Sequence, residues 1–166
     1  MGNAQELWAE VGDIVVKPAI QPDGKGINAD LLMLAAGCIF GASLTRINNQ
    51  AMSKTLRTIT FETCRNILGR VPGKFTGELP EFSFEIASEI IVRIMPELEA
   101  LKLKNAELAS IMAGWIGTWA AKFDAYGVPA EEFIAVSRMF AETVATIDKW
   151  SLHDPQTGDC IGTWTP

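Results

Sequence analysis

The sequence predicts an all-α protein, a compact bundle of five to six helices around one buried apolar helix at about residues 28–45, with an irregular C-terminal tail. Residues 31–42 contain no polar side chain, and Asp30 and Arg46 flank them. Most of the remaining chain repeats apolar residues at the three- and four-residue spacing of amphipathic helices. A helix that is apolar on every side has no solvent face, so we expect the other helices to surround it.

The central helix carries a second signal, a pair of glycines four residues apart. Gly37 and Gly41 lie on one side of it, and small residues at this spacing let another helix approach closely. Ala113 and Gly117 repeat the pattern in a later helix, and we expect these two sides to pack together. The apolar run is shorter than the roughly 20 residues that span a bilayer, so we expect no membrane segment.

The other helices follow from periodicity, caps and breakers. Asn3 with Glu6 resembles a capping box, Gly69 and Gly127 suit helix ends, and Pro96 is expected to kink or restart the chain. An alternative for residues 13–20 is a short strand, because the segment is β-branched at residues 14–16. The helices are expected at residues 3–16, 51–69, from Pro80 or Ser83 to Pro96, 97–104, 105–126 and from Pro129 onward.

The domain organisation is expected to be simple. Residues 1–150 should form a single helical domain, and residues 151–166 an irregular tail, since periodicity is lost and residues 154–159 are rich in turn formers. Residues 160–164 are apolar enough to dock on the body or to pair as a short strand. We expect Trp164 to dock on the helical domain.

The composition indicates the cellular compartment of the protein and the kinds of partner to expect. The net charge is −6 and the isoelectric point about 4.8, which argues for solubility and against nucleic acid as a partner. Three cysteines, with Cys38 in the apolar run, argue against a disulfide framework. The N-terminus lacks a secretory signal pattern, so a cytoplasmic protein is expected.

Metal and cofactor chemistry finds little support. The chain has a single histidine, His153, and neither a Cys-x-x-Cys nor a Glu-x-x-His pair. Glu81, Glu85 and Glu89 share one helix face, but such a run is usually solvated. We therefore expect no metal site and no cofactor.

Catalysis is not expected either. Ser151, His153, Asp154 and Cys160 are crowded into the loose tail, where a nucleophile and its base are difficult to preorganise. No catalytic residue is assigned.

Charge asymmetry is the most informative feature. Residues 46–74 carry six basic side chains and one acidic one. We predict a partner-binding face of Lys54, Arg57, Phe61 and Arg65, opposite a core stripe. That stripe is formed by Met52, Leu56, Ile59, Thr63 and Ile67.

The partner expected on this face is an acidic surface of another protein or a second copy of the chain. The competing interpretation is internal neutralisation, with residues 81–89 of the next helix lying alongside the basic face.

The leading functional hypothesis is a non-enzymatic, protein-binding regulator, adaptor or inhibitor that acts through a helical face, with self-association as a homo-oligomer. The alternative is a ligand-binding helical bundle or enzyme with an apolar pocket near Trp115 and Trp119. Large aromatic residues at that spacing also suit an ordinary core.

Overall fold

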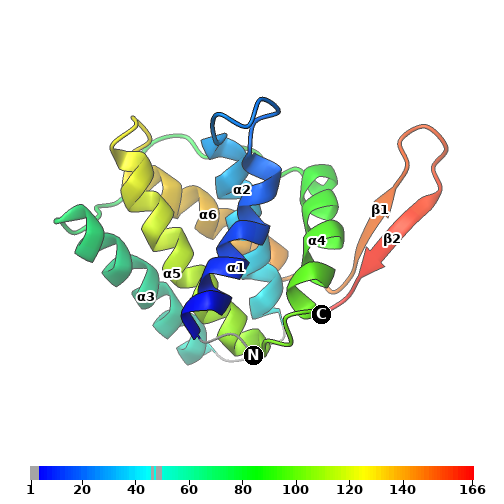
Figure 1. Ribbon diagram of the computed structural model, residues 1–166, viewed down its shortest axis with the longest axis horizontal. Coiled ribbons are helices and arrows are strands. Elements are labelled where there is room, and N and C mark those ends of the chain that lie inside the picture. Colours follow the sequence, from blue (N-terminus) through cyan, green and yellow to red (C-terminus); the bar gives the residue numbers. More distant parts are fainter. Residues whose placement is uncertain (1–3, 46, 48–49) are drawn as a thin grey trace.

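The computed structural model describes residues 4–45, 47 and 50–166. This part of the chain folds into packed helices followed by a two-stranded antiparallel sheet, and the predicted helical bundle is confirmed (Figure 1). The elements are α1 (Ala4–Val16), η1 (Lys17–Ala19), α2 (Ala29–Leu44), α3 (Gln50–Leu68), α4 (Phe84–Glu99), α5 (Asn105–Asp124), α6 (Ala130–Val144), β1 (Trp150–His153) and β2 (Cys160–Trp164).

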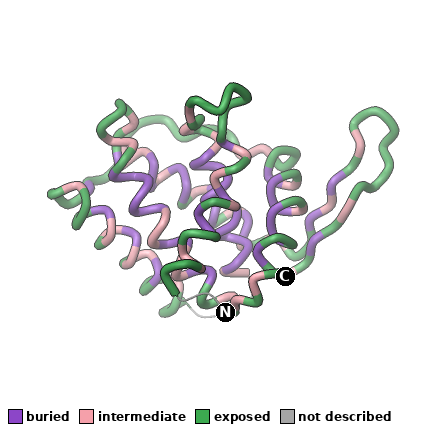
Figure 2. Tube along the Cα trace, in the orientation of Figure 1, coloured by how far each residue is buried: buried purple, intermediate pink, exposed green. Residues whose placement is uncertain are grey.

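Helix α2 forms the centre of the molecule, as its apolar run predicts. Twelve of its 16 residues are buried, and α1, α4, α5 and α6 pack around it (Figure 2). It begins after Asn28, whose side chain accepts a hydrogen bond from the Leu31 amide at 3.1 Å and so caps the helix. Despite this apolarity, neither α2 nor any other helix of the described residues has the length and hydropathy needed to cross a bilayer.

The glycines of α2 pack against α6, whereas the sequence predicted α5. A Cβ atom on Gly37 would lie 2.4 Å from the carbonyl oxygen of Ser137, and one on Gly41 would lie 2.4 Å from that of Ala141. No heavy atom tolerates such a distance, so the backbones of α2 and α6 touch because both glycines lack a side chain. The predicted close approach is present, but its predicted partner was wrong.

The second close helix crossing joins α5 to α3. A Cβ atom on Gly117 would lie 2.4 Å from the carbonyl oxygen of Thr60. The Thr60 hydroxyl donates a hydrogen bond across the same contact to the carbonyl oxygen of Ala113, at 2.9 Å. Ala113 and Gly117 therefore do form a helix-packing surface, and α3 occupies it.

This crossing rotates α3 relative to the prediction. Its buried residues are Leu56, Thr60 and Cys64, whereas Met52 is 40% exposed and Ile67 51% exposed. The predicted core stripe was therefore wrong at both ends. Two helices in backbone contact need small residues between them, and Thr60 and Cys64 meet this requirement better than the isoleucines do.

Two local boundaries also differ from expectation. Residues 13–19 are helical, so the alternative strand was wrong, and Ile20 forms only an isolated bridge with Ile27. Helix α4 continues through Pro96 to Glu99 and no separate helix forms over residues 97–104. The expected cap at Asn3 lies outside the described residues.

The C-terminal tail is a β-hairpin, whereas an irregular segment was expected. Strands β1 and β2 pair antiparallel and pack against α4. Trp150 and Trp164, which face each other in the register, are 2% and 6% exposed, and the Trp164 indole donates to Glu99 at 2.6 Å. The base of the hairpin is thus attached to the body, while its turn projects away (Figure 1).

The contact at Gly41 predicts that an added methyl group destabilises the protein there, but not at Gly114, which lacks such a contact. Gly41→Ala should lower the free energy of unfolding by about 1–3 kcal/mol, because the methyl meets the backbone of α6. Gly114→Ala is the matched control. Its Cβ atom would have the Trp8 indole nitrogen as its nearest neighbour, at 3.7 Å, and alanine favours a helix by about 1 kcal/mol. Urea denaturation measures both, and equal stability of the two variants would contradict the α2–α6 contact.

Candidate protein-binding site

The structure divides the predicted partner-binding residues into two pairs. Because α3 turns Leu56 and Thr60 inward, Arg57 and Phe61 lie at its edge toward α6 and are half-buried. Lys54 and Arg65 lie on the outer surface and are exposed. The predicted place of Phe61 opposite the core stripe implied an exposed side chain, whereas the structure half-buries it.

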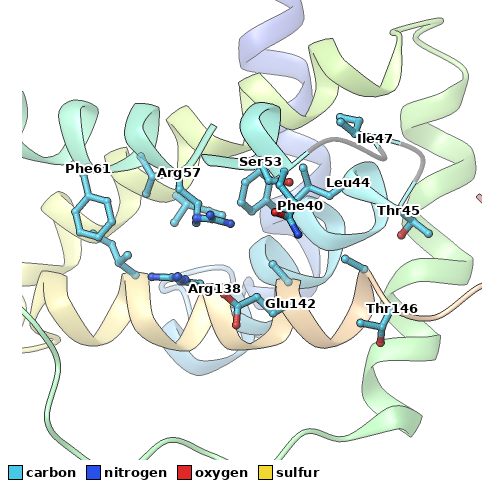
Figure 3. A pocket seen from close by; sticks show the side chains of 16 residues that line it. Phe40, Leu44, Thr45, Ile47, Ser53, Arg57, Phe61, Arg138, Glu142 and Thr146 are labelled. Carbon is cyan, nitrogen blue, oxygen red and sulfur yellow. Dashed lines mark hydrogen bonds and ion pairs between the residues drawn. The ribbon is translucent and has the colours of Figure 1, made fainter. Parts of the chain in front are cut away.

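Arg57 and Phe61 line a groove between α3 and α6 (Figure 3). Helix α3 packs on α5, and α6 packs on α2 and α5, which leaves a hollow of about 500 Å³ between α3 and α6. Phe40 of α2 and Ile116 of α5 contribute to its lining. The hollow is also lined by Leu44, Thr45, Ile47, Gln50, Ser53, Thr60, Ile134, Arg138, Ala141, Glu142, Ala145 and Thr146.

A second hollow, of about 590 Å³, continues the first along α6. It shares Phe61, Ile134, Arg138 and Glu142 with the first, so the two are contiguous. Its other wall is the loop between α3 and α4. This second hollow adds Pro72, Gly73, Lys74, Phe75, Leu79, Glu131, Ala135 and Met139. We call the two together the α3–α6 groove.

The groove combines apolar walls with an unpaired cation. No carboxylate among the described residues forms an ion pair with Arg57. Arg138, on the opposite wall, pairs with Glu142 one turn later at 2.9 Å. A guanidinium presents several donors in a fixed plane and suits a carboxylate or another planar anion. Arg57 is therefore the side chain best placed to recognise a negative group in the groove.

Neutralisation of the basic face by residues 81–89 is not observed. Helix α4 packs against α2 and the hairpin, on the opposite side of the bundle from α3 (Figure 1). Arg65 instead pairs with Glu62 of its own helix at 2.7 Å, an exposed contact that contributes little to stability. Arg46, which the sequence counted with these cations, lies outside the described residues.

A polar cluster fixes the loop wall of the groove. Arg70 donates hydrogen bonds to Glu131 and, at 3.1 Å, to Asp124. Glu131 also accepts the backbone amide of Gly73 at 2.7 Å. The Arg70 hydrogen bond, followed by the Gly73 amide, lowers the pKa of Glu131 to about 2. The cluster thus holds the start of the loop against α6 and places Lys74 beside the groove.

The tryptophans proposed for an alternative pocket stack on one another. Trp115 lies between Trp8, at a ring-centroid distance of 3.6 Å, and Trp119, at 4.9 Å. The Trp115 indole donates to the carbonyl oxygen of Trp8 at 2.8 Å. A Cβ atom on Gly12 would lie 2.3 Å from the Trp115 ring, so this stack also depends on a glycine. Trp115 is therefore packed against its aromatic neighbours.

The cysteines and the histidine do not assemble a recognisable centre. No group of three His, Cys, Asp or Glu side chains that could hold a metal occurs among the described residues. Burial raises the pKa of Cys38 to about 12 and that of Cys64 to about 11, which disfavours their reactive thiolates at neutral pH. His153 and Cys160 face each other in the hairpin, where both are exposed and no pocket described here encloses them.

Sequence reasoning found one wall of the groove and missed the other. The sequence pattern assigned no binding role to Arg138 or Glu142, and it placed Phe40 only in the central apolar helix. Apolar Ile134 and charged Arg138, four residues apart on α6, share a side of the helix and mark the edge of its buried stripe. Their opposition to Phe61 depends on the tertiary arrangement.

Comparison with protein-family models, with curated proteins and with solved structures finds no significant match to this chain. The function of the protein is therefore inferred from the geometry of the α3–α6 groove.

The Glu131 cluster predicts a pH-dependent contribution to stability. Because the folded-state pKa, about 2, lies below the ordinary value of 4.5, the stabilisation is complete above about pH 4.5 and is lost as the pH falls toward 2. Glu131→Gln should lower the free energy of unfolding at pH 7 by about 1–2 kcal/mol, a figure reduced for the solvent exposure of Arg70. The difference from the wild type should shrink in denaturation curves at lower pH. Glu142→Gln, in an exposed pair, is the control, and a pH-independent Glu131→Gln effect would contradict the prediction.

Proposed function

We propose that this protein is a non-enzymatic binding module whose α3–α6 groove receives an amphipathic helix of a partner protein. In this role it acts as a regulator, adaptor or inhibitor. The observation that carries the proposal is Arg57 beside an apolar groove, with no carboxylate partner in the described part of the chain, and Phe61 at the junction of the two hollows.

The dimensions of the groove support a helix as the occupant. Its α6 wall extends from Glu131 to Thr146, which at the rise of an α-helix corresponds to about 22 Å. A partner helix of three to four turns is about as long, and it would bury apolar side chains spaced three, four and seven residues apart. Phe40, Phe61 and Ile134 offer apolar contacts for them.

The basic residues of the groove favour partner helices that carry acidic side chains. An acidic side chain at the edge of the partner's apolar stripe can reach Arg57, and a second can reach Lys74. Lys54 and Arg65 lie outside the groove, where they influence the rate of encounter more than the final affinity. The partner is therefore an acidic protein segment, in keeping with the chemistry expected from the sequence.

A second candidate function arises from the first hollow alone. About 500 Å³ of apolar space beside an arginine also suits a small anionic amphiphile, such as a fatty acid. This keeps the ligand-binding alternative, with the site moved from the stacked tryptophans to the α3–α6 groove.

The proposal predicts binding of a designed acidic amphipathic helix. The probe is a fluorescent peptide of about 16 residues with leucine and alanine on one face and glutamate on the other. Fluorescence anisotropy should show saturable binding that Arg57→Glu weakens at least about tenfold, because the salt bridge becomes a repulsion. Phe61→Ala should weaken it as well.

Lys25→Glu, which makes the same charge change in the remote loop before α2, is the matched control and should bind as the wild type does. Equal binding by the Arg57→Glu variant would overturn the assignment of the groove. Arg57-dependent binding of dodecanoate with no binding of the peptide would favour the small-ligand function instead.

A further inference from the structure

An acidic hollow lies on the other flank of α6. It has a volume of about 570 Å³ and lies between α2, α6 and the residues that lead into α4. Leu34, Val136 and Phe140 are among its apolar walls. Its charged lining consists of four carboxylates with no cation, namely Asp30, Glu78, Glu81 and Glu132. None of the four forms an ion pair within the described part of the chain.

The acidic hollow and the α3–α6 groove lie on the two sides of one ridge of α6, and Leu79 of the loop after α3 lines both hollows. At 3.6 residues per turn, Ile134 and Arg138 share one side of α6 and Glu132 and Val136 the other. Ala135 and Met139 lie between them on the ridge and are half-buried. The face of the molecule centred on α6 is therefore basic on one flank and acidic on the other.

We propose that this face binds a second copy of the chain, in a dimer whose two-fold axis runs along α6. Two copies that face each other about such an axis set the acidic hollow of each against the α3–α6 groove of the other. A two-fold axis across α6 would instead set like charges together. The charge pattern favours the first arrangement. It is a closed, isologous contact, to which both copies contribute the same surface.

The charges that meet are free to pair. Arg57 and Lys74 have no carboxylate partner among the described residues, and they face the four unpaired carboxylates of the other copy. Glu142, close to the axis, is neutralised by Arg138. The net charge of −6 on each chain opposes association over long distances, but salt at physiological strength screens it beyond about 8 Å. Contacts across the interface are shorter than this.

This inference does not depend on the proposed function, although the two share the α3–α6 groove. The second copy covers the groove, so an acidic partner helix and the second copy exclude each other. Dimerisation would then regulate access to the groove, and the acidic peptide should dissociate the dimer.

Charge exchange across the interface tests the dimer directly. Sedimentation equilibrium of the full chain should show a monomer–dimer equilibrium that weakens in about 1 M NaCl. Glu81→Lys with Glu132→Lys removes the net negative charge of the acidic hollow and leaves the groove basic, whereas Arg57→Glu with Lys74→Glu leaves both flanks acidic, so each variant alone should be monomeric. An equimolar mixture of the two variants should form a heterodimer, because both contacts are again complementary.

Glu10→Lys with Asp159→Lys makes the same charge change away from α6 and should leave the dimer intact. A wild-type chain that stays monomeric at about 0.1 mM, or a mixture that fails to associate while both variants retain helical circular dichroism, would overturn the proposal. The Glu81→Lys, Glu132→Lys variant keeps Arg57 and should bind the acidic peptide at least as tightly as the wild type. Loss of peptide binding there would count against the proposed function alone.

Discussion

The backbone contact between α2 and α6 determines the rest of the architecture. Gly37 and Gly41 allow the central helix to touch the carbonyl groups of Ser137 and Ala141, a distance that any side chain would prevent. Gly117 does the same for α5 and α3. Helix α6 thus contacts α2 closely, and helix α3 contacts α5 closely. Helix α6 also packs on α5, and the α3–α6 groove is the space left between α3 and α6.

Other contacts determine where the edges of the bundle lie. The Arg70 cluster attaches the long loop after α3 to the start of α6, and it forms one wall of the groove while doing so. The Trp8–Trp115 stack attaches α1 on the far side of α5, and Gly12 provides the room. The first attachment relies on charged groups that remain partly solvated. The second relies on aromatic rings that stack and remove apolar area from water.

The electrostatics of the molecule are local. The chain is acidic overall, yet Arg57 and Lys74 lie on one flank of α6 and four carboxylates on the other, and none of these groups has an ion-pair partner among the residues that the structure describes. Because salt screens charges beyond about a Debye length, a binding partner responds to the flank it touches more than to the net charge. This separation of charge around one helix suits both an acidic partner helix and a second copy of the chain.

The sequence by itself determined the helices and the burial of α2, because the period of apolar residues and a run without polar side chains are local properties. It also indicated that small residues would mark close contacts, and it predicted a binding face that includes Arg57 and Phe61, both of which line the α3–α6 groove. Only the tertiary structure decided which helices meet at those contacts, and with that the orientation of α3. A glycine in a helix indicates that another segment packs closely against it, but not which segment. For the same reason the opposition of Phe61 to Arg138 could not be predicted. The sequence allowed a short strand at residues 160–164 but did not indicate its partner strand, because the two strands are stabilised by their packing on α4, a contact that no local pattern records.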